Sequence, residues 1–561
     1  MQFLGKNISG KYTIPSGIIT VSLDVLEEIA KIPQIGVLTT KSVGPVVREG
    51  NPEPVYAQIN KDKFTNAVGL PNPGAEYLAE ELKNLKLPED KFLLVSILGG
   101  TPEEFKNVAK LVEPYADGLE LNFSCPHAEG LGQAICSSPE IAISYVKAVQ
   151  EVTNKPLLAK LSPNIDNIKE VSKALIEANI NGFTAINTVG PEENKEPISQ
   201  KPVLSHKTGG ISGNCIKDIG VQKVKEIKEA CQELNKDLPI IGMGGISSQS
   251  DIKEYEEAGA TILGIGTALT GMSTKDIHYF FQNIENPSFE FSKIKETTMQ
   301  FEELTLKETK TLADDLIIQT FDKPIKNTPG QFNFLWIPGL MEKPFSPATI
   351  NPASFAIRVI GPFTQGLKSL KPGDKVMIRG PYGNGFTVKD DKSLHYCLIG
   401  GGTGIAPLYY LTQELSKNIP KEQIHVFLGG RSKNQIYLTT EFKAIANVYI
   451  STDDGSEGFK GFVTQLFEDF IKNNNHKFYH YICGPEIMMK KTFDIAKQSN
   501  FEDIEASMER YMKCGVGICG ICSMDGSRTC VDGTVYKEKF LSNSKCFGIS
   551  HRKKTGELEK Y

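Results

Sequence analysis

Residues 156–189 read PLLAKLSPNIDNIKEVSKALIEANINGFTAINTV, and this stretch decides the fold of the N-terminal half. Short apolar runs at 156–162 and 182–189 flank residues 167–178, where apolar side chains recur at helical spacing. The pattern predicts a strand, a helix and a second strand. Strands joined through a helix pair in parallel, so the stretch indicates an α/β protein with a parallel sheet.

The same alternation continues on both sides of this stretch. Residues 137–153 predict another helix, and further apolar runs predict strands at 35–40, 92–98, 118–124, 239–245 and 261–268. Repeated strand–helix units over about 290 residues predict a closed (β/α)8 TIM barrel.

Polar and glycine residues gather where the expected strands end. They are Lys41-Ser42, Asn122, Lys160, Asn187-Thr188, Gly244-Gly245 and Gly266-Thr267. Ordinary turn chemistry explains any one of these positions. The whole set is better explained by a barrel, which places the carboxyl ends of its strands on the catalytic face.

The chain changes character over residues 285–304, which we interpret as a linker. Short strand-like pieces with Pro and Gly turns follow at 305–387 and predict a small antiparallel β-barrel. A second α/β pattern comes next, with strands at 395–399, 425–428 and 479–483, a glycine turn at 400–404 and a helix at 406–416. We therefore expect four domains, at 1–295, 296–390, 391–505 and 506–561.

The composition is that of an ordinary globular protein. Hydrophobic residues make up 40% and charged residues 23%, and the net charge of -5 gives no reason to expect a nucleic-acid partner. No run approaches 18 apolar residues, and the N-terminus lacks the regions of a signal peptide. We expect a cytoplasmic protein with no membrane partner.

Four of the eleven cysteines form the motif Cys514-x4-Cys519-x2-Cys522-x7-Cys530, and the others are scattered. One clustered metal site in a reducing compartment explains this distribution better than disulfides. The spacing is that of plant-type [2Fe–2S] ligation. A structural zinc site stays open, although zinc sites usually come as two C-x2-4-C pairs.

The stretch Asn122-Phe123-Ser124-Cys125-Pro126 follows an expected strand. A thiol on such a loop can act as a general base near neutral pH, whereas most lone cysteines are small buried hydrophobes. The amides of Asn66, Asn122 and Asn187, with Thr188, favour the catalytic interpretation because they can surround a small polar ring.

Further candidates concern charges and phosphates. Lys41 can add a positive charge, and Lys160 can hold negative charge on a reduced flavin, unless it is a snorkelling surface lysine. The turns at 244–245 and 266–267 can offer backbone N–H groups to a phosphate. Two weaker signals, the turn at 400–404 and Cys483-Gly484-Pro485, together suggest a nicotinamide domain after a flavin domain.

With these residues in hand, two resemblances emerge. Residues 1 to about 290 resemble the catalytic subunit of class IB dihydroorotate dehydrogenases, at 15–17, 41–42, 50–52, 66–72, 122–126, 132–134, 160–164, 209–213 and 242–246. Residues 300–550 resemble the electron-transfer subunit of the same enzymes, of the ferredoxin-reductase-like family, at 343–346, 380–386, 400–411, 452–461, 483–488, from Glu509 onward and at the four cysteines. The chain thus looks like a fusion of two subunits that are normally separate.

The resemblance implies a role for each site residue. Cys125 would take a proton from C5 of dihydroorotate while hydride leaves C6 for FMN. The substrate set would be Lys41, Asn66, Gly69, Leu70, Asn122, Asn187 and Thr188. The FMN set would be Ser16, Lys41, Ser42, Ser96, Asn122, Lys160, Ile186, Gly213, Gly244, Gly245, Gly266 and Thr267.

For the second half, the resemblance implies FAD, NAD and cluster sites. The FAD set would be Lys343, Pro344, Phe345, Ser346, Ala356, Ile357, Arg358, Phe363 and Thr364. The dinucleotide set would be Gly401, Gly402, Thr403, Gly404, Cys483, Gly484 and Pro485. The cluster ligands would be Cys514, Cys519, Cys522 and Cys530. Electrons would run from FMN through [2Fe–2S] and FAD to NAD, in the de novo synthesis of pyrimidines, and the protein would form a homodimer through the barrel domain.

Three positions depart from the family pattern. Lys343 replaces an arginine and loses a planar fork that can grip phosphate. Phe363 stands where the family has glycine, and His127 replaces an asparagine in the loop that would cover the substrate. Any of these can alter affinity without removing the chemical groups.

Alternative functions are a related dihydropyrimidine dehydrogenase and an electron-transfer scaffold with an inactive barrel. The first needs further cysteine-rich regions, which the sequence lacks, and the intact Cys125, Lys160 and asparagines speak against the second. A quinone-linked relative would need a membrane-binding helix and a serine base. The sequence leaves NAD against NADP open, because Arg431 can reach a 2′-phosphate or lie free on the surface.

Overall fold

The computed structural model describes residues 1–124, 135–136, 138–286, 288–289 and 299–561. Its contacts divide the chain into two compact units, each described by itself below. The first, the barrel unit, comprises Met1–Thr298, Lys513–Arg528 and Arg552–Leu558. The second, the reductase unit, comprises Met299–Met512, Thr529–His551 and Glu559–Tyr561. The cysteine-rich C-terminal region therefore contributes to both units, and the finer four-domain division stays a prediction.

The barrel unit contains a closed barrel of eight parallel strands, which confirms the predicted TIM barrel. In barrel order they are β3 (Tyr12–Ile14), β4 (Ile35–Thr39), β7 (Phe92–Ile97), β8 (Gly118–Asn122), β9 (Leu157–Leu161), β10 (Gly182–Ala185), β13 (Ile240–Met243) and β14 (Ile262–Gly264). Seven of these match expected strands. The three residues of β3 are too few to give a recognisable apolar run.

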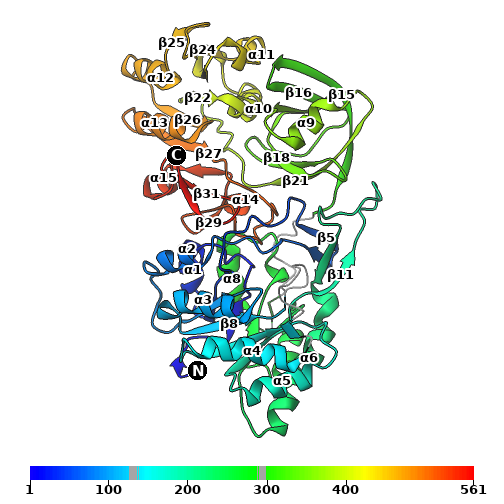
Figure 1. The fold of residues 1–561 in the computed structure, drawn as a ribbon. Helices are drawn as coiled ribbons and strands as arrows, with labels where there is room; N and C mark the ends of the chain where they lie inside the picture. Colours follow the sequence, from blue (N-terminus) through cyan, green and yellow to red (C-terminus); the bar gives the residue numbers. More distant parts are fainter. Residues whose placement is uncertain (125–134, 137, 287, 290–298) are drawn as a thin grey trace. The chain divides into compact units, whose positions relative to one another are not determined.

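A helix follows each barrel strand and packs on the outside of the barrel (Figure 1). The helices are α1 (Leu23–Ala30), α2 (Ala75–Leu82), α3 (Pro102–Val112), α4 (Pro139–Gln150), α5 (Ile168–Glu177), α6 (Lys217–Glu233), α7 (Gln249–Glu257) and α8 (Thr274–Asn283). In α3, the Thr101 hydroxyl caps the N-terminus by accepting a hydrogen bond from the Glu104 backbone N–H, and Pro102 occupies the first turn. Its buried Phe105, Val108 and Val112 recur at helical spacing and form the face turned to the barrel.

The two ends of the barrel differ. One is closed by the hairpin β1 (Gln2–Phe3) and β2 (Lys6–Asn7), whose Phe3 ring packs edge-on against Phe92 at 5.0 Å between centroids. At the carboxyl end of the strands lies an antiparallel sheet that the sequence did not predict, which we call the roof sheet. It consists of β5 (Tyr56–Asn60), β6 (Lys63–Asn66), β11 (Val189–Glu193) and β12 (Thr208–Ser212).

The reductase unit begins with a seven-stranded antiparallel sheet in the order β18-β17-β21-β15-β16-β20-β19. Its elements are β15 (Glu302–Ala313), β16 (Leu316–Phe321), β17 (Phe332–Trp336), β18 (Glu342–Phe345), β19 (Pro347–Ile350), β20 (Ala353–Arg358), β21 (Lys375–Tyr382) and the helix α9 (Pro362–Ser369). The edge strands β18 and β19 are separated only by Ser346, so the two edges come together there and the sheet curls as the expected small barrel does.

A second seven-stranded sheet follows, in the order β25-β24-β23-β22-β26-β27-β30. Its strands are β22 (His395–Gly401), β23 (Ile424–Gly430), β24 (Asn447–Thr452), β25 (Phe459–Lys460), β26 (Phe478–Cys483), β27 (Phe501–Ser507) and β30 (Val535–Lys537); all pair in parallel except β27 with β30. Its helices are α10 (Ile405–Leu415), α11 (Thr439–Ile445), α12 (Val463–Lys472), α13 (Glu486–Ala496) and α15 (Glu538–Asn543). This confirms the predicted second α/β region.

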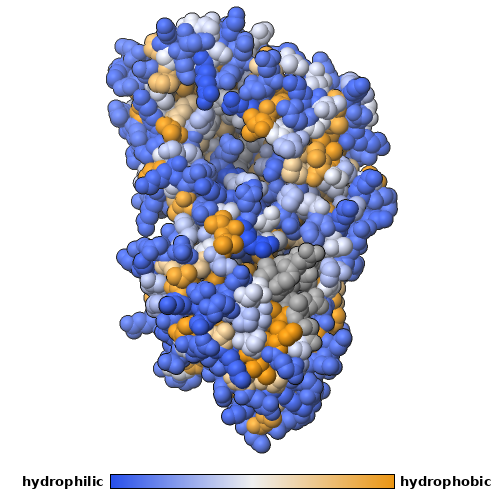
Figure 2. Space-filling model, viewed as in Figure 1, coloured by the Kyte–Doolittle hydropathy of each residue, from blue (hydrophilic) through white to orange (hydrophobic). Residues whose placement is uncertain are grey.

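The C-terminal region adds short elements. They are β28 (Ser523–Met524), β29 (Ser527–Arg528), α14 (Thr529–Asp532), β31 (Ser550–Arg552) and β32 (Leu558–Lys560). None of the helices in the described ranges has the length and apolar character to cross a membrane. The face drawn in Figure 2 is largely hydrophilic where it is coloured, with apolar side chains in small groups.

Candidate functional site

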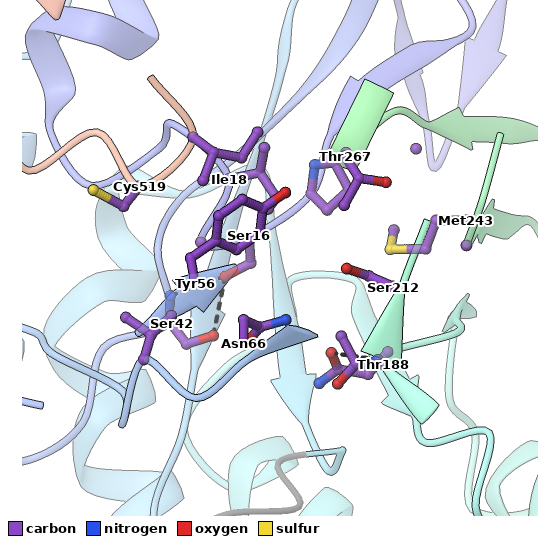
Figure 3. A pocket seen from close by; sticks show the side chains of 18 of the residues that line it. Ser16, Ile18, Ser42, Tyr56, Asn66, Thr188, Ser212, Met243, Thr267 and Cys519 are labelled. Carbon is purple, nitrogen blue, oxygen red and sulfur yellow. Dashed lines mark hydrogen bonds between the residues drawn. The ribbon is translucent and has the colours of Figure 1, made fainter. Parts of the chain in front are cut away.

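A pocket opens at the carboxyl end of the barrel strands (Figure 3). All seven residues of the substrate set line it, and so does every member of the FMN set except Ser96. Residues spread over the N-terminal half thus meet around one cavity, as expected for strand ends of a TIM barrel. Their individual roles stay predictions.

The asparagines at the pocket are held in fixed orientations around Ser124. Asn122 Oδ1 accepts hydrogen bonds from the Ser124 backbone N–H at 3.2 Å and its hydroxyl at 2.9 Å, while Asn187 Nδ2 donates to Ser124 Oγ at 2.9 Å. The Asn187 Oδ1 accepts the backbone N–H of Thr188 at 2.8 Å. Ser124 is fully buried, so these amides fix the position of the residue that directly precedes Cys125 in the sequence.

Cys125 and His127 lie outside the described residues, as does the motif at 132–134. The assignment of Cys125 as the base stays a prediction, and Ser124 is the described residue next to it.

The lysines and serines of the FMN set lie on neighbouring strand ends. Lys160 Nζ is 3.6 Å from Glu120 Oε1, and both side chains are buried. Ser16 and Ser42, drawn in Figure 3, are hydrogen-bonded at 3.0 Å between their hydroxyl oxygens. Ser96 lies behind Ser42, at 2.8 Å from its hydroxyl, and does not itself line the pocket.

Glycine turns form the part of the pocket expected to hold a phosphate. Gly213, Gly244 and Gly245 all have positive φ, and a Cβ on Gly245 would lie 2.7 Å from the Gly213 carbonyl oxygen. The Asn214 side chain ties the turns together by donating to the Gly245 carbonyl at 2.9 Å. A cradle that no side chain can occupy, next to the start of α6, fits the phosphate of FMN.

The loop that carries three of the four cysteines is part of the barrel unit. Its Ile518 carbonyl accepts the Ile19 N–H at 2.7 Å, and its Val516 carbonyl accepts the Gly271 N–H at 2.8 Å. The buried Arg528 donates to the carbonyls of Gly517, at 2.7 Å, and Met272, at 2.9 Å. These bonds attach the loop to the barrel, and Ile518 and Cys519 line the pocket.

Cys514, Cys519 and Cys522 are buried and close together. The hydrogen bond with Cys514, burial and the neighbouring Cys522 raise the pKa of the Cys519 thiol well above its ordinary value. Adjacent buried sulfur donors fit an iron–sulfur cluster, whose positive irons stabilise thiolates. Cys530 is buried in α14 of the reductase unit, and its role as fourth ligand stays a prediction.

Across the described residues, no three His, Cys, Asp or Glu side chains form a group that could hold a metal ion. A binuclear cluster does not need such a group, because its four cysteines are shared between two irons.

Several pocket residues were not identified from the sequence. Tyr56 and Ser212 come from the roof sheet, and Arg48 and Asn51 from the segment before it. The motif at 50–52 contributed to the family resemblance, but its residue types did not indicate a binding or catalytic role. The roof sheet was missed because its strands are short and only partly buried, so they show no clear alternation.

In the reductase unit, the two weak nucleotide signals lie next to each other. Gly400 on β22 pairs with Cys483 on the adjacent strand β26, and α10 begins directly after the turn at 402–404. A Cβ on Gly404 would lie 2.4 Å from the Cys483 carbonyl oxygen, so this approach requires glycine. The N-terminus of α10 at the end of a parallel strand fits a dinucleotide pyrophosphate.

The FAD set lies on β18, β20 and α9, with Ser346 between β18 and β19. Lys343 Nζ lies 5.3 Å from the centre of the Tyr511 ring. Phe363 is buried in the core and stacks on Phe345, so its side chain supports the fold. Thr364 Oγ1 accepts the N–H groups of Ile360 and Gly361 and thereby caps α9. The N-terminus of α9, which follows Gly361, and the Lys343 side chain on β18 are both positive groups that can bind an anionic cofactor.

Three family models match the sequence. One described as "Dihydroorotate dehydrogenase" covers residues 1–286, one described as "Oxidoreductase NAD-binding domain" covers 398–494, and one described as "Iron-sulfur cluster binding domain of dihydroorotate dehydrogenase B" covers 509–540. The last match favours iron–sulfur over the zinc alternative.

Curated relatives divide between the two halves. The catalytic subunit of dihydroorotate dehydrogenase B (NAD(+)) from Methanocaldococcus jannaschii is 39% identical over 259 residues, which are 46% of this chain and 82% of that protein. The same subunit from Pyrococcus horikoshii is 37% identical over 293 residues, 52% of this chain and 92% of that protein.

The second half is similar to different proteins. A probable electron transfer subunit of dihydroorotate dehydrogenase B (NAD(+)) from M. jannaschii is 42% identical over 245 residues, 43% of this chain and 91% of that protein. One family model spans just over half of this chain. Both subunits from M. jannaschii are similar to this chain, the catalytic subunit to its first half and the electron transfer subunit to its second half. The predicted resemblance is therefore confirmed. The chain belongs to the dihydroorotate dehydrogenase family, as a fusion of regions similar to the catalytic and electron-transfer subunits of the B type.

Proposed function

We propose that this chain oxidises dihydroorotate to orotate and delivers the electrons to NAD within a single polypeptide. The observation that carries the proposal is the composition of the barrel pocket. Ile518 and Cys519, from the cysteine loop, line the same cavity as Asn122 and Lys160 from the strand ends. A one-electron carrier at the wall of a polar substrate pocket is the arrangement that such a reaction needs.

The substrate is inferred from the groups that face the pocket. Asn66, Asn122, Asn187 and Thr188 offer donors and acceptors to the carbonyl and N–H groups of a small planar ring. Lys41 offers a positive charge to its carboxylate. These neutral and cationic groups match dihydroorotate better than a dihydropyrimidine without a carboxylate.

Cys125 is the proposed base, because it follows Ser124 at the point that Asn122 and Asn187 hold in place. Its thiolate would remove the proton from C5 of dihydroorotate, and a thiol with a reference pKa of about 8.5 is suited to this task near neutral pH. The asparagines would meanwhile hold the ring in one orientation.

The proposal includes three resident cofactors and NAD. The FMN set and the FAD set would hold the two flavins, the four cysteines the [2Fe–2S] cluster and the dinucleotide set the NAD. When bound, FMN supplies a hydride acceptor, the [2Fe–2S] cluster a one-electron carrier and FAD a two-electron donor to NAD. Lys160 would stabilise negative charge on the reduced ring, and the Gly213, Gly244 and Gly245 turns would bind the phosphate of FMN through backbone N–H groups.

The test is an anaerobic titration of the purified protein with dihydroorotate, followed in the visible spectrum. We expect flavin and iron–sulfur bands to bleach and to return when NAD is added. Unbleached spectra in a protein that holds both flavins would reject dihydroorotate as substrate. Bleaching that NADP reverses and NAD does not would retain the substrate and correct the acceptor. Dimerisation through the barrel domain and a cytoplasmic location stay predictions.

A further inference from the structure

Glu120 is a buried carboxylate to which neither the sequence nor the proposed mechanism gives a role. It lies on β8, two residues before Asn122, with 1% of its side chain exposed. Its Oε1 is 3.6 Å from Lys160 Nζ and accepts a hydrogen bond from Ser96 Oγ at 2.8 Å. A charge this deep in a barrel is costly to bury unless it is paired, so the position calls for an explanation.

Glu120 ends a chain of hydroxyl groups that starts at the pocket wall. Ser96 Oγ is 2.8 Å from Ser42 Oγ, and Ser42 Oγ is 3.0 Å from Ser16 Oγ. Ser16 and Ser42 line the pocket, whereas Ser96 and Glu120 do not. The chain therefore connects the pocket to a carboxylate beneath it.

The carboxylate sets the direction of every bond in the chain. An ionised carboxylate can only accept, so Ser96 donates to Glu120 and its oxygen is left to accept from Ser42. The Ser42 oxygen is then left to accept the Asn122 amide N–H, which lies at 3.0 Å. One buried charge thus orients Ser42 and Asn122, both of which face the pocket.

Glu120 also balances the charge of the pocket. Among the described residues that line the pocket, Lys41, Arg48 and Lys160 are cationic and none is a carboxylate. Glu120 lies just behind this wall and pairs with Lys160, the cation assigned to the flavin ring. The field that Lys160 exerts in the pocket is therefore partly cancelled by its own partner.

We propose that Glu120 is a positioning residue that holds Lys160 and the Ser16–Ser42–Ser96 hydroxyl chain in place and lowers the reduction potential of the bound flavin by offsetting the Lys160 charge. This inference rests on the proposed function, because it needs FMN beside Lys160. It predicts that the reduction potential of FMN rises when the net charge of Glu120 and Lys160 becomes more positive and falls when it becomes more negative.

The experiment is redox titration of the FMN in the intact protein, with Glu120→Gln as the first variant. Removing the negative charge leaves Lys160 uncompensated, which favours the reduced, more negative flavin. We expect the ratio of reduced to oxidised FMN at a fixed potential to rise about tenfold or more, equivalent to about 30 mV for a two-electron couple. Glu120→Asp keeps the charge and should stay within about twofold of the parent.

A double-mutant cycle on Glu120 and Lys160 separates the electrostatic effect of the pair on the FMN potential from a general loss of structure. Lys160→Met leaves Glu120 uncompensated and should shift the ratio in the opposite direction, toward oxidised FMN. The double variant Glu120→Gln, Lys160→Met is neutral again and should return most of the way to the parent value. It also carries the test if the single Gln variant does not fold, because replacing both members of a buried pair is often tolerated.

Lys91→Met is the matched control for loss of a buried cation. Lys91 lies in the same unit and donates to Ser9 Oγ and to the carbonyls of Ile32 and Ile35, away from the pocket. It should lower the melting temperature without moving the potential. Equal potentials for the parent, Glu120→Gln and Lys160→Met, in proteins that bind FMN and are reduced by dihydroorotate, would overturn this inference alone. A purified parent protein that does not bind FMN would instead overturn the FMN site of the proposed function.

Discussion

The barrel mouth and the nucleotide edge of the reductase sheet are both built at the carboxyl ends of parallel strands, but from different groups. The barrel presents side chains, among them Asn122, Asn187 and Lys160, which line its pocket. The sheet presents backbone, because Gly404 and Gly484 meet where β22 and β26 end and leave no room for a Cβ.

The difference follows from what each site has to recognise. A small ring with carbonyl, N–H and carboxylate groups needs donors and acceptors at separate positions, which only side chains provide. A pyrophosphate needs several N–H groups at close range, which a glycine turn at a helix N-terminus provides. The barrel site should therefore be sensitive to side-chain chemistry and the sheet site to added volume.

The largest expected effect tests the barrel side. Cys125→Ser should slow the reduction of FMN by dihydroorotate about 10²- to 10⁴-fold at pH 7, because a serine hydroxyl is a far weaker general base than a thiolate. The measurement is stopped-flow flavin bleaching. Oxidation of NADH by an artificial dye, which uses only the reductase side, should keep its rate.

Cys215→Ser is the matched control, since Cys215 is an exposed thiol in the same unit. It should leave both rates unchanged. If Cys125→Ser slowed the NADH reaction as much as the dihydroorotate reaction, the assignment of separate chemistry to the barrel pocket would be wrong.

The second prediction separates the units by acid stability. Burial lowers the pKa of His480 to about 3 and that of His425, where His395 and His476 add to the effect, to about 4. Both lie in the reductase sheet. The unfolded chain takes up protons below about pH 6.5 while the folded sheet does not, so stability is lost as pH falls from about 6.5 toward 3. For His480 the loss is on the order of 5 kcal/mol.

We expect the reductase unit to unfold in acid before the barrel unit, whose described histidines His206 and His278 are not fully buried. The single tryptophan, Trp336, lies in the reductase unit and reports its unfolding by fluorescence. His480→Phe, in a site already lined by Phe467 and Phe478, should shift that transition to lower pH, and His206→Ala should not. Coincident acid transitions of Trp336 and the barrel flavin would contradict the prediction.

Much of the fold could be predicted from periodicity, but not all of it. The strands β7, β8 and β9 are buried along their whole length and mostly apolar, because both faces of a barrel strand are covered. β3 escaped recognition because it has three residues, and β10 was expected to run to Val189 but ends at Ala185. Asn187 and Thr188 line the pocket instead of continuing β10, so the strand ends before these two pocket residues.

The site was predictable to the extent that its residues follow strands. Asn122, Lys160 and Asn187 stand at strand ends, where topology alone brings them together. Glu120 and Ser96 lie inside the strands and contact each other only because β7 and β8 pair in a particular register. Register depends on packing between segments far apart in sequence, so no local pattern could reveal this pair.

The third prediction tests the sheet side of the comparison. Gly404→Ala places a methyl group 2.4 Å from the Cys483 carbonyl oxygen and forces β22 and β26 apart where the dinucleotide is expected. Overpacking of this kind costs about 1–3 kcal/mol, so the KM for NAD should rise roughly 5- to 150-fold. Reduction of FMN by dihydroorotate should be unchanged. Gly339→Ala is the control in the same unit: its φ of +87° strains an alanine, but a Cβ there meets nothing, so the variant should lose stability without a rise in the KM for NAD.

The smallest expected effect on the partial reactions concerns the cysteine loop, which is expected to pass electrons from one half-reaction to the other. Gly520 has φ of +72° and lies so close to the barrel that a Cβ would meet the Ile19 carbonyl oxygen at 2.3 Å. Gly520→Ala should weaken the attachment of the loop through about 1–2 kcal/mol of left-handed backbone strain and about 1–3 kcal/mol of overpacking against Ile19, while the hydrogen bonds to Val516 and Gly517 remain. Reduction of FMN by dihydroorotate and oxidation of NADH by dye should both persist, while electron transfer from dihydroorotate to NAD slows. The measurement is the rate of the overall reaction set against the two partial reactions in one preparation. A variant that loses one partial reaction together with the overall one would show that the loop supports that site directly, rather than joining two sites that work independently.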